Sequence, residues 1–239
     1  MNQSWTIAKK ELASFFNSLI AYILLIAFLV FTGIFTWIYG GGDVFFRKQA
    51  DMQVFFSFAN IILIIFIPAI TMRLLSEERK SGTMELLLTK NVSNRQVVLG
   101  KFTAAFLMVC ITLAFTLVYY FSISRLGNFD HGASITGYLG LLLMSAAYIS
   151  IGLFASSLTK NQIVAFLLAL AISICFRFMF DLIASSMTGW LGDLFNTLSL
   201  QNHYDSIARG VIDTKDVIYF LSITALGIFL SEYMISKRS

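Results

Sequence analysis

The sequence has little charge, one proline and two cysteines. Only 13% of its 239 residues are charged, against roughly a quarter in soluble domains, while 58% are hydrophobic. A charge deficit of this size excludes an ordinary soluble fold. With one proline and no low-complexity segment, no long disordered linker is expected. Cys110 and Cys175 both lie in apolar runs, so a disulfide framework is not expected either.

Motifs of common catalytic and nucleotide-binding sites are also missing. There is no GxxxxGK[ST] phosphate loop, because Gly100-Lys101 lacks the earlier glycine and the following Ser or Thr, so the chain is not expected to hydrolyse ATP. No HExxH, CxxC or GxSxG motif occurs, and the only histidines are His131 and His203. We therefore predict no metal site and no enzymatic activity, and an intramembrane enzyme is disfavoured.

What the sequence contains is six apolar segments, each long enough to cross a bilayer, which takes about 20 helical residues. Each run is continuous rather than alternating, which favours helices over the strands of a membrane barrel. The fold class is thus an all-α membrane protein, a single transmembrane domain over residues 1–239. The predicted spans are residues 19–39, 54–72, 102–123, 138–158, 163–182 and 217–234. The first is too long for a signal peptide and is expected to be retained.

The basic residues predict the orientation. With the N-terminus inside, eleven lysines and arginines fall on the cytoplasmic side and five on the other, which favours cytoplasmic N- and C-termini. We therefore read the net charge of +4 as a topology signal and expect no nucleic-acid partner. The eleven are Lys9, Lys10, Arg73, Arg79, Lys80, Lys90, Arg95, Lys101, Lys160, Lys237 and Arg238.

Residues 1–18 precede the first span and carry aromatic and basic side chains at helical spacing. This pattern predicts an amphipathic helix that lies in the plane of the membrane interface. A solvated tail is the alternative, but such a tail needs no tryptophan and no pair of phenylalanines. The candidate residues are Trp5, Lys9, Lys10, Glu11, Phe15 and Phe16.

The loop between the second and third spans, residues 73–101, holds six of the eleven cytoplasmic basic residues and three of the five glutamates. Charges of both signs beside apolar anchors suit a docking surface, although a solvated loop that follows the membrane is the alternative. Pro68 is expected to bend or end the preceding helix, and Gly82 to allow a turn before a short helix. The candidate docking residues are Glu77, Glu78, Arg79, Gly82, Thr83, Glu85, Leu86 and Leu87.

The predicted fifth span contains a charged pair, Arg177 and Asp181, four residues apart and so on one helix face. Arg177 would lie roughly 21 Å along a core of about 30 Å, close enough to the outer surface to extend its side chain there. Anchoring at that surface and a role in a transport path both remain open. Residues 183–216 follow, with apolar side chains at helical spacing from Trp190, which predicts one or two short helices dipping into the outer leaflet.

The stretch PAITMRLLSEERKSGTMELLL, residues 68–88, resembles the signature of ABC-2 type transporter permeases, through the pattern E-R-x-x-G-T-x-E-x-L. Lys10-Glu11 and Phe15-Phe16 before the first span also resemble that family. The stretch NHYDSIARGVID, residues 202–213, resembles permease subunits of bacteroidete gliding-motility ABC transporters. Members of that subgroup often have proline where Leu19 stands, which puts the entry angle of the first helix in doubt.

The resemblance implies a permease subunit in a bacterial inner membrane, used in export or gliding motility. It implies pairing with a second permease chain, identical or different, through helices one and five. It also implies two ATPase subunits that bind ATP and Mg, so that this chain has no cofactor, and a coupling helix at residues 77–88. Residues 183–206 would form re-entrant outer helices, and an accessory subunit with a large periplasmic domain would complete the gliding type. A scaffold without transport activity is the alternative.

Overall fold

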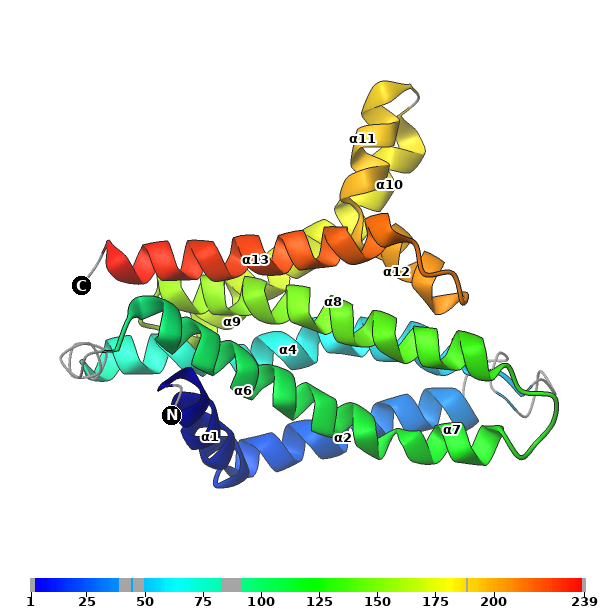
Figure 1. Cartoon of the computed structure of the whole chain (residues 1–239), viewed down its shortest axis with the longest axis horizontal. Helices are drawn as coiled ribbons and strands as arrows, with labels where there is room; N and C mark the ends of the chain where they lie inside the picture. The colour runs from blue at the N-terminus through cyan, green and yellow to red at the C-terminus, as the bar shows by residue number, and fades with distance from the viewer. Residues whose placement is uncertain (1–2, 39–43, 45–49, 83–91, 188, 238–239) are drawn as a thin grey trace.

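The computed structural model of the chain describes residues 3–38, 44, 50–82, 92–187 and 189–237. Every regular element among these residues is a helix, and the long helices run roughly side by side in one bundle (Figure 1). Six helices in this part of the chain are long and apolar enough to cross a membrane. The predicted number of spans and the all-helical fold class are therefore confirmed.

The observed spans match the predicted segments and extend several of them. They are α2 (Leu19–Trp37), α4 (Gln53–Ser81), α6 with α7 (Asn94–Phe115 and Leu117–Ile123), α8 (His131–Leu158), α9 continued by α10 (Gln162–Ile174 and Phe180–Ser186), and α13 (Thr214–Ser236). A π-helical turn, Cys175–Met179, joins α9 to α10. Shorter helices are α1 (Gln3–Phe16), α11 (Trp190–Leu198) and α12 (Leu200–Ala208).

Polar side chains fix where several helices begin. Ser93 accepts a hydrogen bond from the backbone of Gln96, whose side chain in turn accepts from the backbone of Ser93, a capping box at the start of α6. Asp130 caps α8 by accepting from the Ala133 N–H at 2.9 Å. Asp213 caps α13 by accepting from the Lys215 N–H at 3.1 Å. Local chemistry thus sets these boundaries.

The two central helices, α4 and α8, pack closely because α8 offers a glycine where α4 carries a threonine. A Cβ atom on Gly152 would lie 2.1 Å from Thr71 Oγ1. On another face of α8, Ser150 occupies the space beside Gly227 of α13, where a Cβ would lie 2.6 Å from its hydroxyl oxygen. Small residues permit this close approach of helices in lipid. The stripe Ala165, Ala169 and Ser173 of α9 is likewise fully buried within the bundle.

Helix α4 continues past its proline, so of the two outcomes expected for Pro68, a bend or an end of the helix, the end does not occur. It runs without interruption from Gln53 to Ser81. Downstream of the proline, the Ser156 hydroxyl of α8 accepts hydrogen bonds from the N–H groups of Leu75 and Ser76, at 3.1 and 3.0 Å. These contacts tie α4 to α8 about two turns after the proline, and a proline within a membrane helix is tolerated where neighbouring helices pack against it.

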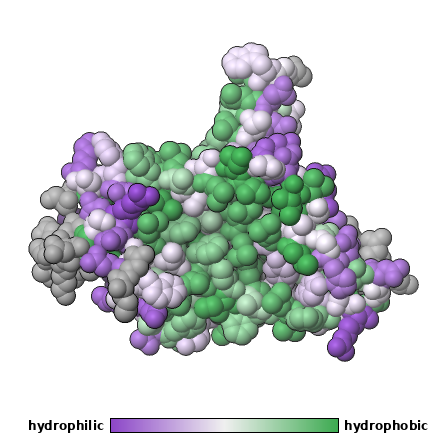
Figure 2. All heavy atoms as spheres, viewed as in Figure 1, coloured by the Kyte–Doolittle hydropathy of each residue, from purple (hydrophilic) through white to green (hydrophobic). Residues whose placement is uncertain are grey.

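The surface shows how the bundle sits in a membrane. Hydrophobic residues form a band across its middle, and hydrophilic residues gather at both ends (Figure 2). The beginning of the chain, the end of α4, the start of α6 and the end of α13 lie toward one end, which we call the terminal end (Figure 1). An apolar band between two polar ends is the surface of a multi-pass membrane protein.

Helices α10 and α11 form a hairpin that stands out sideways from the bundle (Figure 1). Its exposed apolar side chains include Leu182, Trp190 and Leu194. The sequence predicted short helices after the fifth span, and α11 and α12 are those helices. Span five also reaches Ser186, beyond the predicted end at residue 182.

Candidate functional site at the terminal end

Helix α1 lies against the start of α6, and a glycine makes the contact possible. A Cβ on Gly100 would lie 2.8 Å from Ile7 Cβ and from the backbone oxygen of Ser4. Ala8 and Phe15, on the same side of α1, are buried. The helix therefore packs on the bundle along one face.

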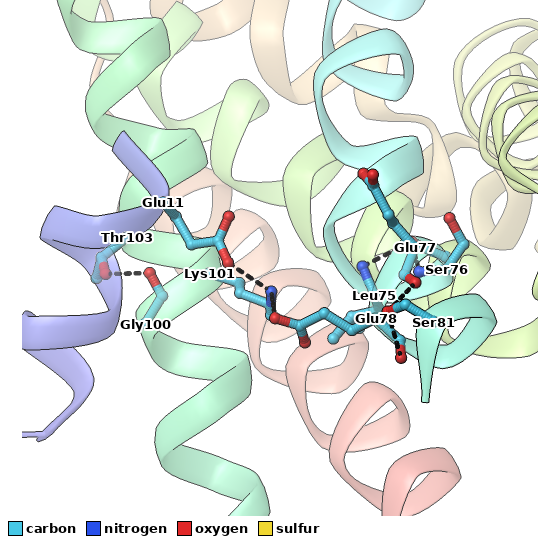
Figure 3. Close-up of polar contacts among 10 residues, drawn as sticks. Glu11, Leu75, Ser76, Glu77, Glu78, Ser81, Gly100, Lys101 and Thr103 are labelled. Atoms are coloured by element: carbon cyan, nitrogen blue, oxygen red, sulfur yellow. Dashed lines mark hydrogen bonds and ion pairs between the residues drawn. The ribbon is translucent and has the colours of Figure 1, made fainter. Parts of the chain in front are cut away.

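One residue after this glycine, Lys101 connects three helices. Its ammonium Nζ lies 2.7 Å from Glu11 Oε1 on α1 and 2.8 Å from Glu78 Oε1 in the last turns of α4 (Figure 3). The Lys101 side chain is only 1% exposed, and the two glutamates are 19% and 18% exposed. A lysine is rarely buried unless it is paired, so the two carboxylates account for its position.

The remaining charges of the last turns of α4 face in different directions. Arg79 Nη1 donates a hydrogen bond to the Ser157 backbone oxygen, which ties α4 to the end of α8. The Glu77 carboxylate is exposed and points away from Lys101 (Figure 3), and Lys80 is exposed too. Gly82 ends the helix with φ +72°, a left-handed conformation that favours glycine, in agreement with the predicted turn.

A second cation on α4 holds the connection between α1 and α2. Arg73 Nη1 donates to the Ser18 hydroxyl at 3.3 Å, and the guanidinium lies 5.0 Å from the centre of the Phe15 ring. Ser18 stands between α1 and α2. Arg73 directly, and Glu78 through Lys101, attach the N-terminal segment to the same end of α4.

The family model described as ABC-2 family transporter protein matches residues 5–236. This is nearly the whole chain and includes most of α1, the six spans and the charged cluster. The chain belongs to the ABC-2 transporter family. The family resemblance of residues 68–88 is thereby confirmed at the level of the family. No curated protein matches the chain.

Members of the ABC-2 family are non-catalytic membrane components of transporters, and membership implies an ATPase partner and a lipid bilayer around the spans. In this ABC-2 permease, four of the predicted docking residues belong to the described part of the chain. They are Glu77, Glu78, Arg79 and Gly82. Thr83, Glu85, Leu86 and Leu87 lie outside the described residues. Glu78 and Arg79 bind other helices of the permease, so that of these four described residues Glu77 and Gly82 are the exposed ones.

The residues of α1 that were predicted to form an interfacial helix lie in two different environments. Phe15 is buried, Phe16 packs against the core, and Glu11 binds Lys101, so this face contacts protein rather than lipid. Trp5 is exposed, with Lys9 Nζ 5.6 Å from its ring centre. Phe15 therefore packs against the bundle, while Trp5 stays on the exposed side of the helix.

Lys101 appeared in the sequence only as a topology signal, and its role was missed. A periodicity argument could have found it. Val97, Val98, Ala104 and Ala105, which lie three and four residues to either side, are all fully buried, so Lys101 occupies the middle of a buried helix face. A lysine on such a face needs an anionic partner.

The predicted pair of Arg177 and Asp181 is not formed. Both residues belong to the described part of the permease, and their charged groups do not come within ion-pair distance of each other. Asp181 is exposed on α10, whereas the Arg177 side chain is directed into the bundle. Arg177 is also 5% exposed, so it is buried in protein and does not reach the surface as an anchor.

Proposed function

We propose that the chain is the membrane-spanning permease subunit of an ABC transporter, and that a separate ATPase subunit binds at the terminal end. This end would face the cytoplasm of a bacterial inner membrane, consistent with the excess of basic residues on that side. The single observation that carries the proposal is the buried Lys101, which joins α1, α4 and α6 beside the exposed end of α4. ATP and Mg would be bound by the partner.

Docking and transmission would use different residues of the same helix end. Exposed charges of opposite sign, Glu77 and Lys80, are available for a partner and suit electrostatic recognition. Glu78 and Arg79 face inward, so a force applied at the exposed surface would reach α1 and α6 through Glu78 and α8 through Arg79. The end of α4 would thus contain an exposed contact surface, with Glu77 and Lys80, and inward-facing residues, Glu78 and Arg79, that connect α4 to other helices.

Helix α4 is suited to carry movement across the membrane. Its 29 residues form one uninterrupted helix, about 43 Å long at 1.5 Å per residue. Near its other end, the Asn60 side-chain Nδ2 donates to Gln201 Oε1 of α12 at 3.2 Å, and the Tyr204 hydroxyl donates to the Phe56 backbone oxygen at 3.1 Å. A tilt of α4 imposed at the terminal end would therefore displace α12 at the opposite end.

The complete transporter would contain a second permease chain, identical or different. Helices α2 and α9 support this, since both expose apolar side chains along much of their length, including Ile23, Phe31, Ile163 and Leu167. The resemblance of residues 202–213 favours a gliding-motility complex with an accessory subunit over general export. A scaffold without transport activity remains the competing function, and it requires no change in response to ATP.

Purification of the tagged full chain from its native membranes, in mild detergent, tests the proposal. We expect a protein that hydrolyses ATP, identifiable by mass spectrometry, to copurify in stoichiometric amount. The double variant Glu77→Lys with Lys80→Glu keeps the net charge and reverses the exposed contacts, so it should lower the ATPase yield at least fivefold. The matched control is Arg125→Glu with Asp193→Lys, which reverses exposed charges away from this helix end.

Absence of any ATPase from the wild-type preparation would overturn the proposal. An equal ATPase yield from the charge-reversed and control chains would overturn the docking surface. The scaffold alternative is favoured if the ATPase copurifies but hydrolysis is the same in all chains and transport or movement does not depend on ATP.

A further inference from the structure

Arg177 lies in the fifth membrane-spanning segment, and part of its guanidinium group has no hydrogen-bond partner among the described residues. Its side chain is 5% exposed, and its Nε and Nη1 atoms find no hydrogen-bond partner among the described residues. Its guanidinium carbon lies 4.7 Å from the centre of the Phe178 ring, a cation–π contact. A π-helical turn, which often marks a functional position, carries both residues.

The neighbouring carboxylates do not neutralise this cation. Asp181 and Asp205 are near enough to influence it electrostatically, yet neither forms an ion pair with it. Asp205 instead accepts a hydrogen bond from Gln201 Nε2 at 2.6 Å. Asp181 is exposed and lines a separate pocket between α10 and α11.

A second buried donor belongs to the same surroundings. The Tyr148 hydroxyl, on the central helix α8, is fully buried and has no hydrogen-bond partner in the described structure. Tyr148 is near enough to Arg177 to influence it electrostatically, and its helix α8 packs against the α9 part of the fifth span. Tyr204, the other tyrosine near Arg177, already donates to the Phe56 backbone oxygen. Two unused donors, one of them cationic, therefore come from adjacent helices.

An uncompensated charge inside a membrane protein is expensive and by default points to function. The group that satisfies a guanidinium and a hydroxyl donor together is an oxyanion, such as a phosphate or a carboxylate. Around Arg177, the side chains of Ile174, Met179 and Leu182 are apolar and exposed on the outside of the bundle. An alkyl chain could lie along them while its anionic head reaches the arginine.

We propose that Arg177 and Tyr148 bind the anionic headgroup of an amphipathic molecule. The ligand class is a single oxyanion attached to an alkyl chain, and its source is either a bilayer phospholipid or a single-chain cargo. The site needs the folded permease in a lipid or detergent environment and does not need the ATPase. Its failure would therefore leave the proposed transporter function standing, and the reverse also holds.

The test uses the full chain in dodecyl maltoside, with dodecyl phosphate as the anionic probe. We expect dodecyl phosphate to raise the thermal unfolding temperature of the wild-type chain and to stay bound in native mass spectrometry. Arg177→Gln should weaken binding at least tenfold, and Tyr148→Phe severalfold. Arg125→Gln, which removes an exposed arginine, should bind as the wild type does.

The two possible sources of the ligand, a bilayer phospholipid and a single-chain cargo, are distinguished by transferring the chain into nanodiscs. The nanodiscs contain phosphatidylcholine with or without phosphatidylglycerol. Retention of phosphatidylglycerol that depends on Arg177 identifies a bilayer lipid, whereas Arg177-dependent binding of dodecyl phosphate alone identifies a single-chain cargo. Binding of dodecyl phosphate that is equal in wild type and Arg177→Gln, or absent from both, overturns the site. If Arg177→Gln does not fold, Tyr148→Phe decides, because unchanged affinity in that variant also overturns the proposal.

Discussion

The ammonium group of Lys101 lies 2.8 Å from the carboxylate of Glu78, and almost none of the lysine side chain contacts solvent. The same nitrogen binds Glu11, so one cation holds α1, α4 and α6 together. Any movement of the last turns of α4 must either carry the other two helices with it or break a buried ion pair. This gives the terminal end of the bundle a defined mechanical linkage.

Lys101→Met is expected to destabilise the protein strongly. The variant keeps much of the apolar stem but leaves two carboxylates without their cation, and removal of one partner of a buried ion pair costs about 3–5 kcal/mol. Unfolding of the purified chain by a denaturing detergent measures the change. Lys215→Met is the control, since Lys215 is 73% exposed and its pair with Asp213 is on the surface. Similar stability of the two variants would contradict the role given to the buried cluster.

Gly152→Ala should disturb the packing of the two central helices. The added Cβ would lie 2.1 Å from Thr71 Oγ1, so α4 and α8 must shift. We expect this overpacking to lower the free energy of unfolding by about 1–3 kcal/mol. The same unfolding measurement detects the loss. Gly127→Ala is the control, because the nearest atom to its new Cβ is 3.5 Å away. Adding Thr71→Ala should restore part of the stability lost in Gly152→Ala, and no recovery in the double variant would argue against this contact.

Ser156→Ala should loosen α4 just before the charged cluster. The variant removes the acceptor of the hydrogen bonds from the Leu75 and Ser76 N–H groups. Loss of each bond should cost about 1 kcal/mol of stability. We expect faster amide hydrogen exchange in peptides that cover residues 72–78. Ser185→Ala, which removes only a bond within an exposed turn, should leave the exchange of these peptides unchanged. Unaltered exchange in Ser156→Ala would mean that α4 does not depend on this side chain.

Stability should respond to pH through Asp205. Burial raises the pKa of its carboxyl above 3.8, despite the hydrogen bond from Gln201, because the charged form is poorly solvated. Above the raised pKa the folded protein therefore carries an unfavourable charge that Asp205→Asn removes while keeping an acceptor for Gln201.

We expect Asp205→Asn to unfold at a higher temperature than the wild type at neutral pH. The difference should shrink as pH falls through the raised pKa and vanish below 3.8, where aspartic acid is neutral in both states. The thermal unfolding temperatures of both chains, measured across this pH range, check the sign of the effect. A stabilisation that is independent of pH, or a destabilisation at neutral pH, would show that burial of the charge is not the dominant effect.

The sequence predicts the spans because length and apolar continuity determine them almost alone. The cap at Asp213 and the turn at Gly82 also follow from local chemistry. Lys101 and Arg177 do not, because their roles depend on which helices lie beside them. For Lys101, burial follows from its own helix face, but its partners Glu11 and Glu78 come from distant segments. For Arg177, the side chain is buried among neighbouring helices while its expected partner Asp181 is exposed, and the sequence alone does not show this difference.

The most direct test of the account compares Glu78→Gln with the charge-reversed Glu77→Lys, Lys80→Glu chain in the complex purified with its ATPase. Glu78→Gln keeps a hydrogen-bond acceptor for Lys101 but weakens the buried linkage, whereas the double variant changes only exposed charges. The measurement is the rate of ATP hydrolysis per bound ATPase in lipid, together with ATPase yield. We predict a full ATPase yield but at least fivefold slower hydrolysis for Glu78→Gln, and loss of the ATPase itself for the double variant. Wild-type yield and wild-type hydrolysis in both chains would contradict the account.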